Sequence, residues 1–110
     1  MLVTLRTIRQ MTMDTKELTS LKNTCKDVIA KQHLQEQIDC NNLVVTKLKQ
    51  HAQDFINAQH PDIRVAIELY FFKGKSWTMV SSTLKGQIHT ADSLRVGITR
   101  ACNSWDIRSI

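Results

Sequence analysis

The strongest constraint on the fold is a helical spacing of apolar residues that extends along nearly the whole chain. With only 3 Gly and 1 Pro among 110 residues, few positions interrupt that spacing. It outweighs the strict alternation of apolar and polar residues that is typical of half-buried strands. We therefore expect an all-α fold, built as one small domain or as one small domain with an extended helical arm.

Net charge and cysteine content narrow the class of protein. The net charge of +5 favours a polyanionic partner, with nucleic acid ahead of an anionic membrane. The three cysteines lack CxxC spacing, so a disulfide framework is not expected and a reducing cytoplasm fits better. No apolar run approaches the ~18 residues of a membrane span, so we expect no membrane partner.

The N-terminal region predicts a leader followed by a helix. Residues 1–13 are too short and too polar for a signal peptide, and we expect a frayed or strand-like segment there, with Met11 and Met13 as candidate later starts. Asp14, with Glu17 three positions on, predicts the N-cap of the first helix. The apolar residues that follow form a narrow seam of the coiled-coil or hairpin type: Leu18, Leu21, Cys25, Val28, Leu34 and Ile38.

The segment Asp39–Asn42 leaves two topologies open. Its Asp and Asn side chains compete with a helix for backbone hydrogen bonds, which favours a turn. With a turn, residues 14–59 fold back as an αα-hairpin. Without one, they form a single long arm that needs a partner to bury its apolar stripe. We expect residues 14–59 to form the contact of a homodimer.

Residues 61–105 contain three short amphipathic helix patterns in succession. Pro61 suits the first turn of one helix, and Gly74 suits its end. Ser76 and Thr90 predict the N-caps of the next two. Three helices joined by turns in this order are typical of a helix-turn-helix, which usually reads DNA in the major groove. The sequence thus predicts four segments: a poorly ordered leader (1–13), a helical arm (14–59), a helix-turn-helix domain (61–105) and a tail (106–110).

The polar face of the last predicted helix supplies the candidate DNA contacts. Arginine reaches guanine edges or phosphates, and hydroxyl groups bond to phosphates or base edges. We therefore predict contacts with double-stranded DNA from Thr90, Ser93, Arg95, Thr99 and Arg100. Lysines near helix ends would lie beside the phosphate backbone, namely Lys73, Lys75 and Lys85. The alternative is that these charges form an ordinary solvated face.

Catalytic and metal chemistry is not indicated. The histidines have no partners at metal-ligand spacing, and the sequence contains no Gly-rich phosphate loop and no GxSxG. Cys102 lies on the apolar stripe of the last helix, which argues against a catalytic thiol. Trp77 and Trp105 also fall on predicted buried stripes and are expected in the core. We expect no enzymatic activity, no cofactor and no metal.

The segment ELYFFKGKSWTMV, followed by TADSLRVGITRA, resembles the C-terminal helix-turn-helix of sigma factors, known as region 4. The chain also resembles small phage-encoded regulators of the RinA/ArpU type, in which a helical arm precedes such a module. The resemblance implies a phage or prophage transcription regulator in the cytoplasm of a bacterial host. A homodimer would present two recognition helices to two half-sites of DNA. The matching positions are Gly74, Ser76, Trp77, Val80, Leu84, Ser93, Leu94, Ile98, Arg100 and Ala101.

Three departures from this pattern leave a second function open. The turn from Leu84 to Thr90 is longer than the usual one. Gly97 lies inside the predicted recognition helix, where Gly costs ~1 kcal/mol relative to Ala. The helix that begins at Trp77 is unusually uncharged, and an uncharged exposed face can bind protein. The alternative is a phage-encoded module that engages host RNA polymerase or inhibits a host DNA-handling protein.

Overall fold

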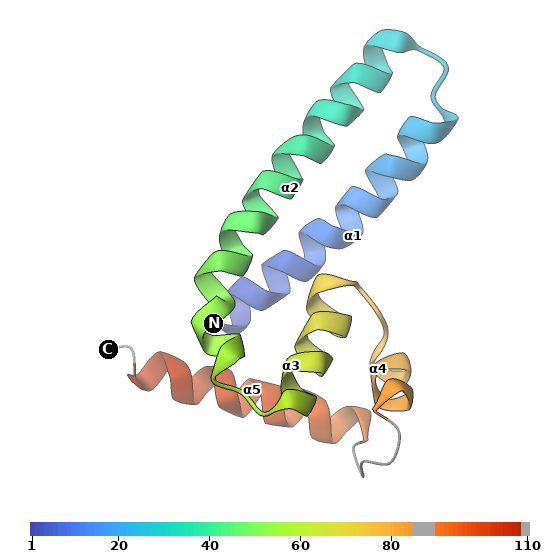
Figure 1. Ribbon diagram of the computed structural model, residues 1–110. Coiled ribbons are helices and arrows are strands. Elements are labelled where there is room, and N and C mark those ends of the chain that lie inside the picture. Colours follow the sequence, from blue (N-terminus) through green and yellow to red (C-terminus); the bar gives the residue numbers. More distant parts are fainter. Residues whose placement is uncertain (85–89, 109–110) are drawn as a thin grey trace.

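The computed structural model describes residues 1–84 and 90–108, and the regular structure in this part of the chain is entirely helical. The predicted all-α fold is therefore confirmed. Helices α1 and α2 form a long hairpin, which stands on a base made by the shorter C-terminal elements (Figure 1). In chain order the elements are α1 (Leu2–Thr24), α2 (Val28–Asn57), α3 (Pro61–Ile67), the π-helical η1 (Glu68–Phe72), α4 (Trp77–Thr83) and α5 (Ala91–Arg108).

The hairpin alternative is correct, but its turn lies at residues 25–27 and not at Asp39–Asn42. Asp27 is the N-cap of α2, because its carboxylate accepts hydrogen bonds from the amides of Ile29 (2.9 Å) and Ala30 (3.4 Å). Within α2, the side chain of Gln35 donates to the carboxylate of Asp39 four residues later (2.7 Å). This pairing along the helix surface removes the competition with the backbone that favoured a turn.

The leader predicted over residues 1–13 is wrong, because α1 begins at Leu2. Leu5 and Ile8 are fully buried and belong to the same core cluster as residues of α2, α3 and α5. Asp14 lies inside α1 rather than at its N-cap, and its carboxylate accepts a hydrogen bond from Gln10 (2.9 Å). The apolar side chains of the first ten residues are buried by packing against the C-terminal helices, which the local sequence does not reveal.

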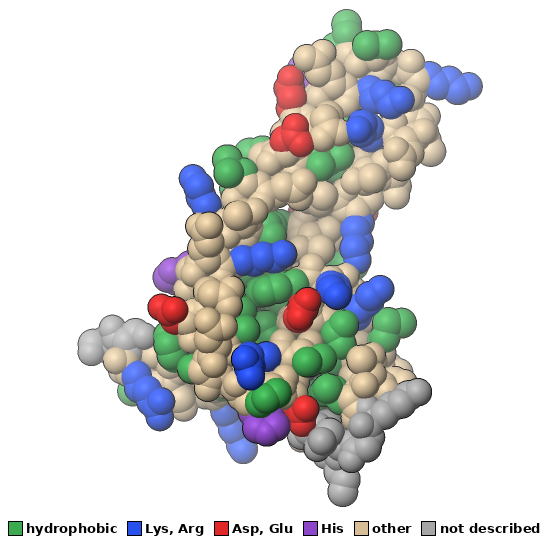
Figure 2. Space-filling model, in the orientation of Figure 1, with side chains coloured by type: hydrophobic (Ala, Val, Ile, Leu, Met, Phe, Trp, Pro, Cys, Tyr) green, Lys and Arg blue, Asp and Glu red, His purple; other side chains and the backbone are tan. Residues whose placement is uncertain are grey.

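The core lies at the base, where the start of α1 and the end of α2 meet the C-terminal helices. Phe55 of α2 is fully buried, and its ring meets the Trp105 ring edge-on at 5.6 Å between centroids. In the upper hairpin Ile38 is buried, whereas Val28 and Ile29 are exposed at the tip. The space-filling view shows hydrophobic side chains over the base and a further group at the hairpin tip (Figure 2).

The predicted helix signals of the C-terminal half are confirmed. Gly74, just past η1, has φ 70°, a conformation that favours glycine. The Ser76 hydroxyl accepts a hydrogen bond from a first-turn amide of α4 (3.3 Å), and the Thr90 hydroxyl does the same for α5 (3.0 Å). The predicted tail is wrong in part, because α5 continues to Arg108. Within the described residues, no helix combines the length and the hydropathy needed to cross a bilayer.

Replacement of Leu5 or Ile8 by alanine should lower the free energy of unfolding by about 2–5 kcal/mol, because each leaves a cavity in a packed core. Val3→Ala is the matched control in the same helix, since Val3 is 76% exposed, and it should change stability by less than about 0.5 kcal/mol. Urea denaturation followed by circular dichroism measures all three. Equal stability of Leu5→Ala and Val3→Ala would contradict the placement of residues 1–13 in the core.

Candidate functional site

The predicted DNA-contact residues of α5 lie on two different sides of the helix. Ser93 and Arg100 are exposed, and helical spacing places them with Val96 on the side away from the buried stripe. Arg95 and Thr99 instead line a cleft that faces α1. The face predicted as one surface is therefore divided between an outward side and a cleft side.

Among the described residues, Arg95 is held only by a neighbour on its own helix. Its Nη2 lies 3.3 Å from Oδ1 of Asp92, and the two side chains are 62% and 87% exposed. Exposed ion pairs of this kind contribute roughly 0–1 kcal/mol, so another anion can compete for the guanidinium. The Thr99 hydroxyl donates to the Arg95 carbonyl oxygen (2.9 Å). Thr90 is the exposed N-cap described above, and Lys85, with the rest of the long predicted turn, lies outside the described residues.

The predicted phosphate contacts Lys73 and Lys75 lie between η1 and α4, and both side chains are exposed. The Nζ of Lys73 lies 3.7 Å from Oε1 of Glu68. Their backbone carbonyls are bound by α1, because Lys16 Nζ donates to the Lys73 oxygen (2.7 Å) and Arg9 Nη1 donates to the Lys75 oxygen (3.2 Å). The segment is therefore fixed to the hairpin, and neither lysine lines the cleft.

Gly97 is not required by a close backbone approach. A Cβ added there would lie 3.9 Å from Cδ1 of Ile63, which is an ordinary van der Waals contact. Gly97 therefore faces α3 rather than the outward side of α5. The departure from the family pattern at this position does not alter the outward side.

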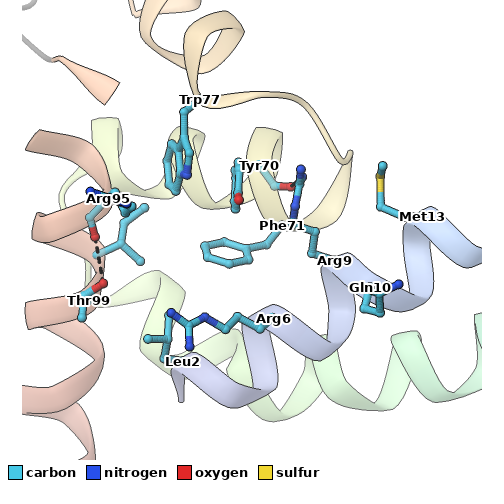
Figure 3. Close-up of a pocket in the computed structure, with 11 residues that line it drawn as sticks. Leu2, Arg6, Arg9, Gln10, Met13, Tyr70, Phe71, Trp77, Arg95 and Thr99 are labelled. Atoms are coloured by element: carbon cyan, nitrogen blue, oxygen red, sulfur yellow. Dashed lines mark hydrogen bonds between the residues drawn. The ribbon is translucent and has the colours of Figure 1, made fainter. Parts of the chain in front are cut away.

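The structure brings together a site that the sequence did not predict. A cleft of about 320 Å³ lies between α1, η1, α4 and α5, with side chains from all four elements pointing toward it (Figure 3). Arginines and aromatic residues meet there, and within the described residues no Asp or Glu lines it. The members that define its chemistry are Arg6, Arg9, Arg95, Tyr70, Phe71 and Trp77.

One wall of the cleft is a stack of Arg9, Tyr70 and Trp77. The Tyr70 and Trp77 rings are stacked at 3.9 Å between centroids and 14° between planes, and the Arg9 guanidinium carbon lies 3.8 Å from the Tyr70 centroid. At these separations the two neighbours must lie on opposite faces of Tyr70, as Figure 3 shows. The Tyr70 phenol ring is thus clamped between α1 and α4.

Arg9 also caps the end of η1. Its Nη1 donates to the Tyr70 carbonyl oxygen (2.7 Å) and to the Lys75 carbonyl oxygen (3.2 Å). The last carbonyls of a helix have no partners within it, and a cation there complements the helix dipole. Sequence reasoning missed Arg9 because residues 1–13 were assigned to the leader. The regular i, i+3 spacing of Leu2, Leu5 and Ile8 was the signal that could have found it.

Arg6, one turn before Arg9, differs from it in its lack of bonds to the described residues. It lines the cleft, is exposed, and makes no hydrogen bond or ion pair with the described residues. None of the described residues therefore pairs with its positive charge. Arg6 and Arg95 approach the same cleft from α1 and α5, respectively.

Cys102 is fully buried, as the apolar stripe predicts. Burial raises the pKa of its thiol from 9.0 to about 11, so the thiol stays protonated at neutral pH. A protonated, buried thiol is a poor nucleophile. Across residues 1–84 and 90–108, no three His, Cys, Asp or Glu side chains are grouped to hold a metal ion.

Arg9→Ala should lower the free energy of unfolding by about 2–3 kcal/mol, because it removes charged hydrogen bonds to two carbonyls and the stacking on Tyr70. Arg9→Lys should restore only part of this, since lysine lacks the planar guanidinium. Arg6→Ala is the control, with the same charge change on the same helix, and its effect should stay below about 0.5 kcal/mol. Urea denaturation measures the stability of all three variants. The same unfolding midpoint for Arg9→Ala and Arg6→Ala would contradict this role for Arg9.

Comparisons with known proteins do not assign the chain to a family. No family model, curated protein or solved structure matches it.

Proposed function

We propose that this protein is a DNA-binding transcription regulator of phage or prophage origin. In this proposal α4 and α5 are the two helices of a helix-turn-helix, and α5 is the recognition helix. The observation that carries the proposal is the outward side of α5, a long helix that follows a short one: Ser93 and Val96 are exposed in its first turns, and Arg100 is exposed on the same side near its middle. The resemblance to sigma-factor region 4 leads to the same assignment.

Electrostatics supports a polyanionic partner. Arg100, Lys73 and Lys75 are exposed, and the overall charge is +5. On the face drawn in Figure 2, Lys and Arg side chains are spread over the base and the hairpin rather than gathered in one patch. A spread charge attracts DNA without fixing its position. Positioning would therefore come from the side chains of α5.

We propose further that two copies associate through the hairpin. Leu21, Val28, Ile29 and Leu43 are exposed apolar residues of α1 and α2 that no other described element covers. Burial of such residues against a second copy removes apolar surface from water. The dimer would present two α5 helices to half-sites about 34–36 Å apart, one turn of DNA.

A second candidate function is a protein-binding module that engages host RNA polymerase or inhibits a host DNA-handling protein. It is favoured by α4, where Met79 is 51% exposed in a shallow hollow whose described lining residues carry no charge. Thr78, Ser82 and Thr83 line the same hollow. A large exposed methionine among small hydroxyl residues is typical of adaptable protein contacts.

Arg100→Ala should weaken binding to duplex DNA from the protein's own genomic neighbourhood by roughly 5- to 100-fold, the range of one lost base or phosphate contact. Arg108→Ala is the charge-matched control, because it lies eight residues farther along α5, about 12 Å away, at the other end of the helix. Fluorescence anisotropy at several salt concentrations measures both, and affinity should fall steeply with salt.

The double variant Arg95→Ala, Arg100→Ala tests whether α5 is the recognition helix. Full, salt-sensitive affinity in a folded double variant would contradict the assignment of α5 as the recognition helix. The protein-binding alternative expects a different pattern. There, duplex DNA is not retained at low salt, and binding to purified host RNA polymerase is lost in Met79→Glu but kept in Arg100→Ala.

Leu43→Glu should convert a dimer to a monomer. Leu43 is 57% exposed in the single chain and would be buried in the proposed contact, where a glutamate would bring an unpaired charge. Ser104→Glu, an exposed position of α5, gives the same charge change outside the hairpin and should leave the dimer intact. Size-exclusion chromatography with light scattering reads the mass of each. A wild-type protein that is monomeric at high micromolar concentration would exclude the hairpin dimer.

A further inference from the structure

The cleft between α1, η1, α4 and α5 has the size and the lining of a small-molecule site. Its volume of about 320 Å³ lies at the lower end of the range for ligand pockets, roughly 300–1,000 Å³. Such pockets are mostly apolar, with a few polar groups that fix the orientation of the ligand. This cleft has that composition, with arginine as its charged component.

The charge of the cleft selects the class of ligand. Arg6 makes no hydrogen bond or ion pair with the described residues, and Arg95 has only the exposed pair with Asp92, so both guanidinium groups are open to an anion. Arg9 is already engaged by two backbone carbonyls and the Tyr70 ring, and so it belongs to the wall. Guanidinium groups bind carboxylate and phosphate oxygens through paired hydrogen bonds.

The apolar part of the lining fits a planar body. Phe71 and Ile98 are buried side chains that reach the cleft from η1 and α5. The Trp77 ring centroid lies 6.3 Å from that of Phe71, and the indole is held in place by its stack on Tyr70 (Figure 3). A pre-formed aromatic wall lowers the entropy lost when a flat ligand packs against it.

We propose that this cleft binds a small organic anion with a planar apolar body and one carboxylate or phosphate group. The body packs against Trp77 and Phe71, and the anionic group pairs with Arg6 and Arg95. The cleft opens on the side of α5 away from Ser93 and Arg100. Binding is therefore expected with no DNA present, and the inference does not rest on the proposed function.

The test uses three probes of one shape: 1-naphthoate, 1-naphthyl phosphate and the neutral 1-naphthamide. Each is titrated into ¹⁵N-labelled full chain without DNA, and the two indole N–H signals are followed by NMR. Trp77 lines the cleft, whereas Trp105 packs on Phe55 in the core and serves as the internal control. Saturable shifts of the Trp77 signal with at least one anion, and roughly tenfold weaker binding of the amide, are expected.

Arg6→Met and Arg95→Met, which keep the apolar stems, should each weaken binding of the anion by roughly tenfold. Arg64→Met on α3 removes the same charge from an exposed position outside the cleft and should leave the affinity unchanged. The stronger of the two anions identifies carboxylate or phosphate as the preferred group. Equal affinity for the amide and both anions, equal shifts of Trp77 and Trp105, or unchanged affinity in Arg6→Met would each overturn the proposal.

Discussion

The packing of the first turns of α1 onto the C-terminal helices is the interaction on which the rest of this structure depends. Helix α4 has seven residues, and α3 continues directly into η1 as a helical segment of twelve, so neither is long enough to be stable as an isolated helix in water. Leu5 and Ile8 supply buried apolar surface to the core that these short helices share. Arg9 then donates to the carbonyls of Tyr70 in η1 and of Lys75 after it, so the turn before α4 is bound to α1. The hairpin is thus part of the base rather than an appendage to it.

The same packing gives α5 two sides with different surroundings. Because the first turns of α1 meet α5 on one side, the flank with Arg95 and Thr99 faces a cleft, while the side with Ser93 and Arg100 faces solvent. A helix-turn-helix packed only on its own three helices would leave both sides open. The arginines of α1 and α5 approach one cavity only because the chain's two ends are brought together at the base.

Sequence predicted the features that are decided within one helical turn and missed those decided by distant contacts. The caps at Ser76 and Thr90 and the positive φ of Gly74 depend on local backbone chemistry, and they are where the residues predict them. The signals at Asp14 and at Asp39–Asn42 were equally good locally, but a buried leader and intrahelical pairing overrode them. The cleft could not be predicted for the same reason. Arg6 and Arg9 become part of it only through contacts with elements over sixty residues away, such as the hydrogen bond from Arg9 to Tyr70.

Arg95 is the charged residue common to both proposals, and this constrains how they can be linked. A ligand shifts an equilibrium only through a difference in its affinity for two states, so a bound anion has to compete with DNA for a group or move α5. The weak, exposed pair with Asp92 leaves the Arg95 guanidinium free to turn toward the cleft or toward a phosphate. An anion that holds Arg95 in the cleft would keep its guanidinium from turning out of the cleft toward a phosphate. If both proposals hold, an anion in the cleft and a DNA phosphate would compete for this one guanidinium, and DNA affinity would be lower in the ligand-bound state.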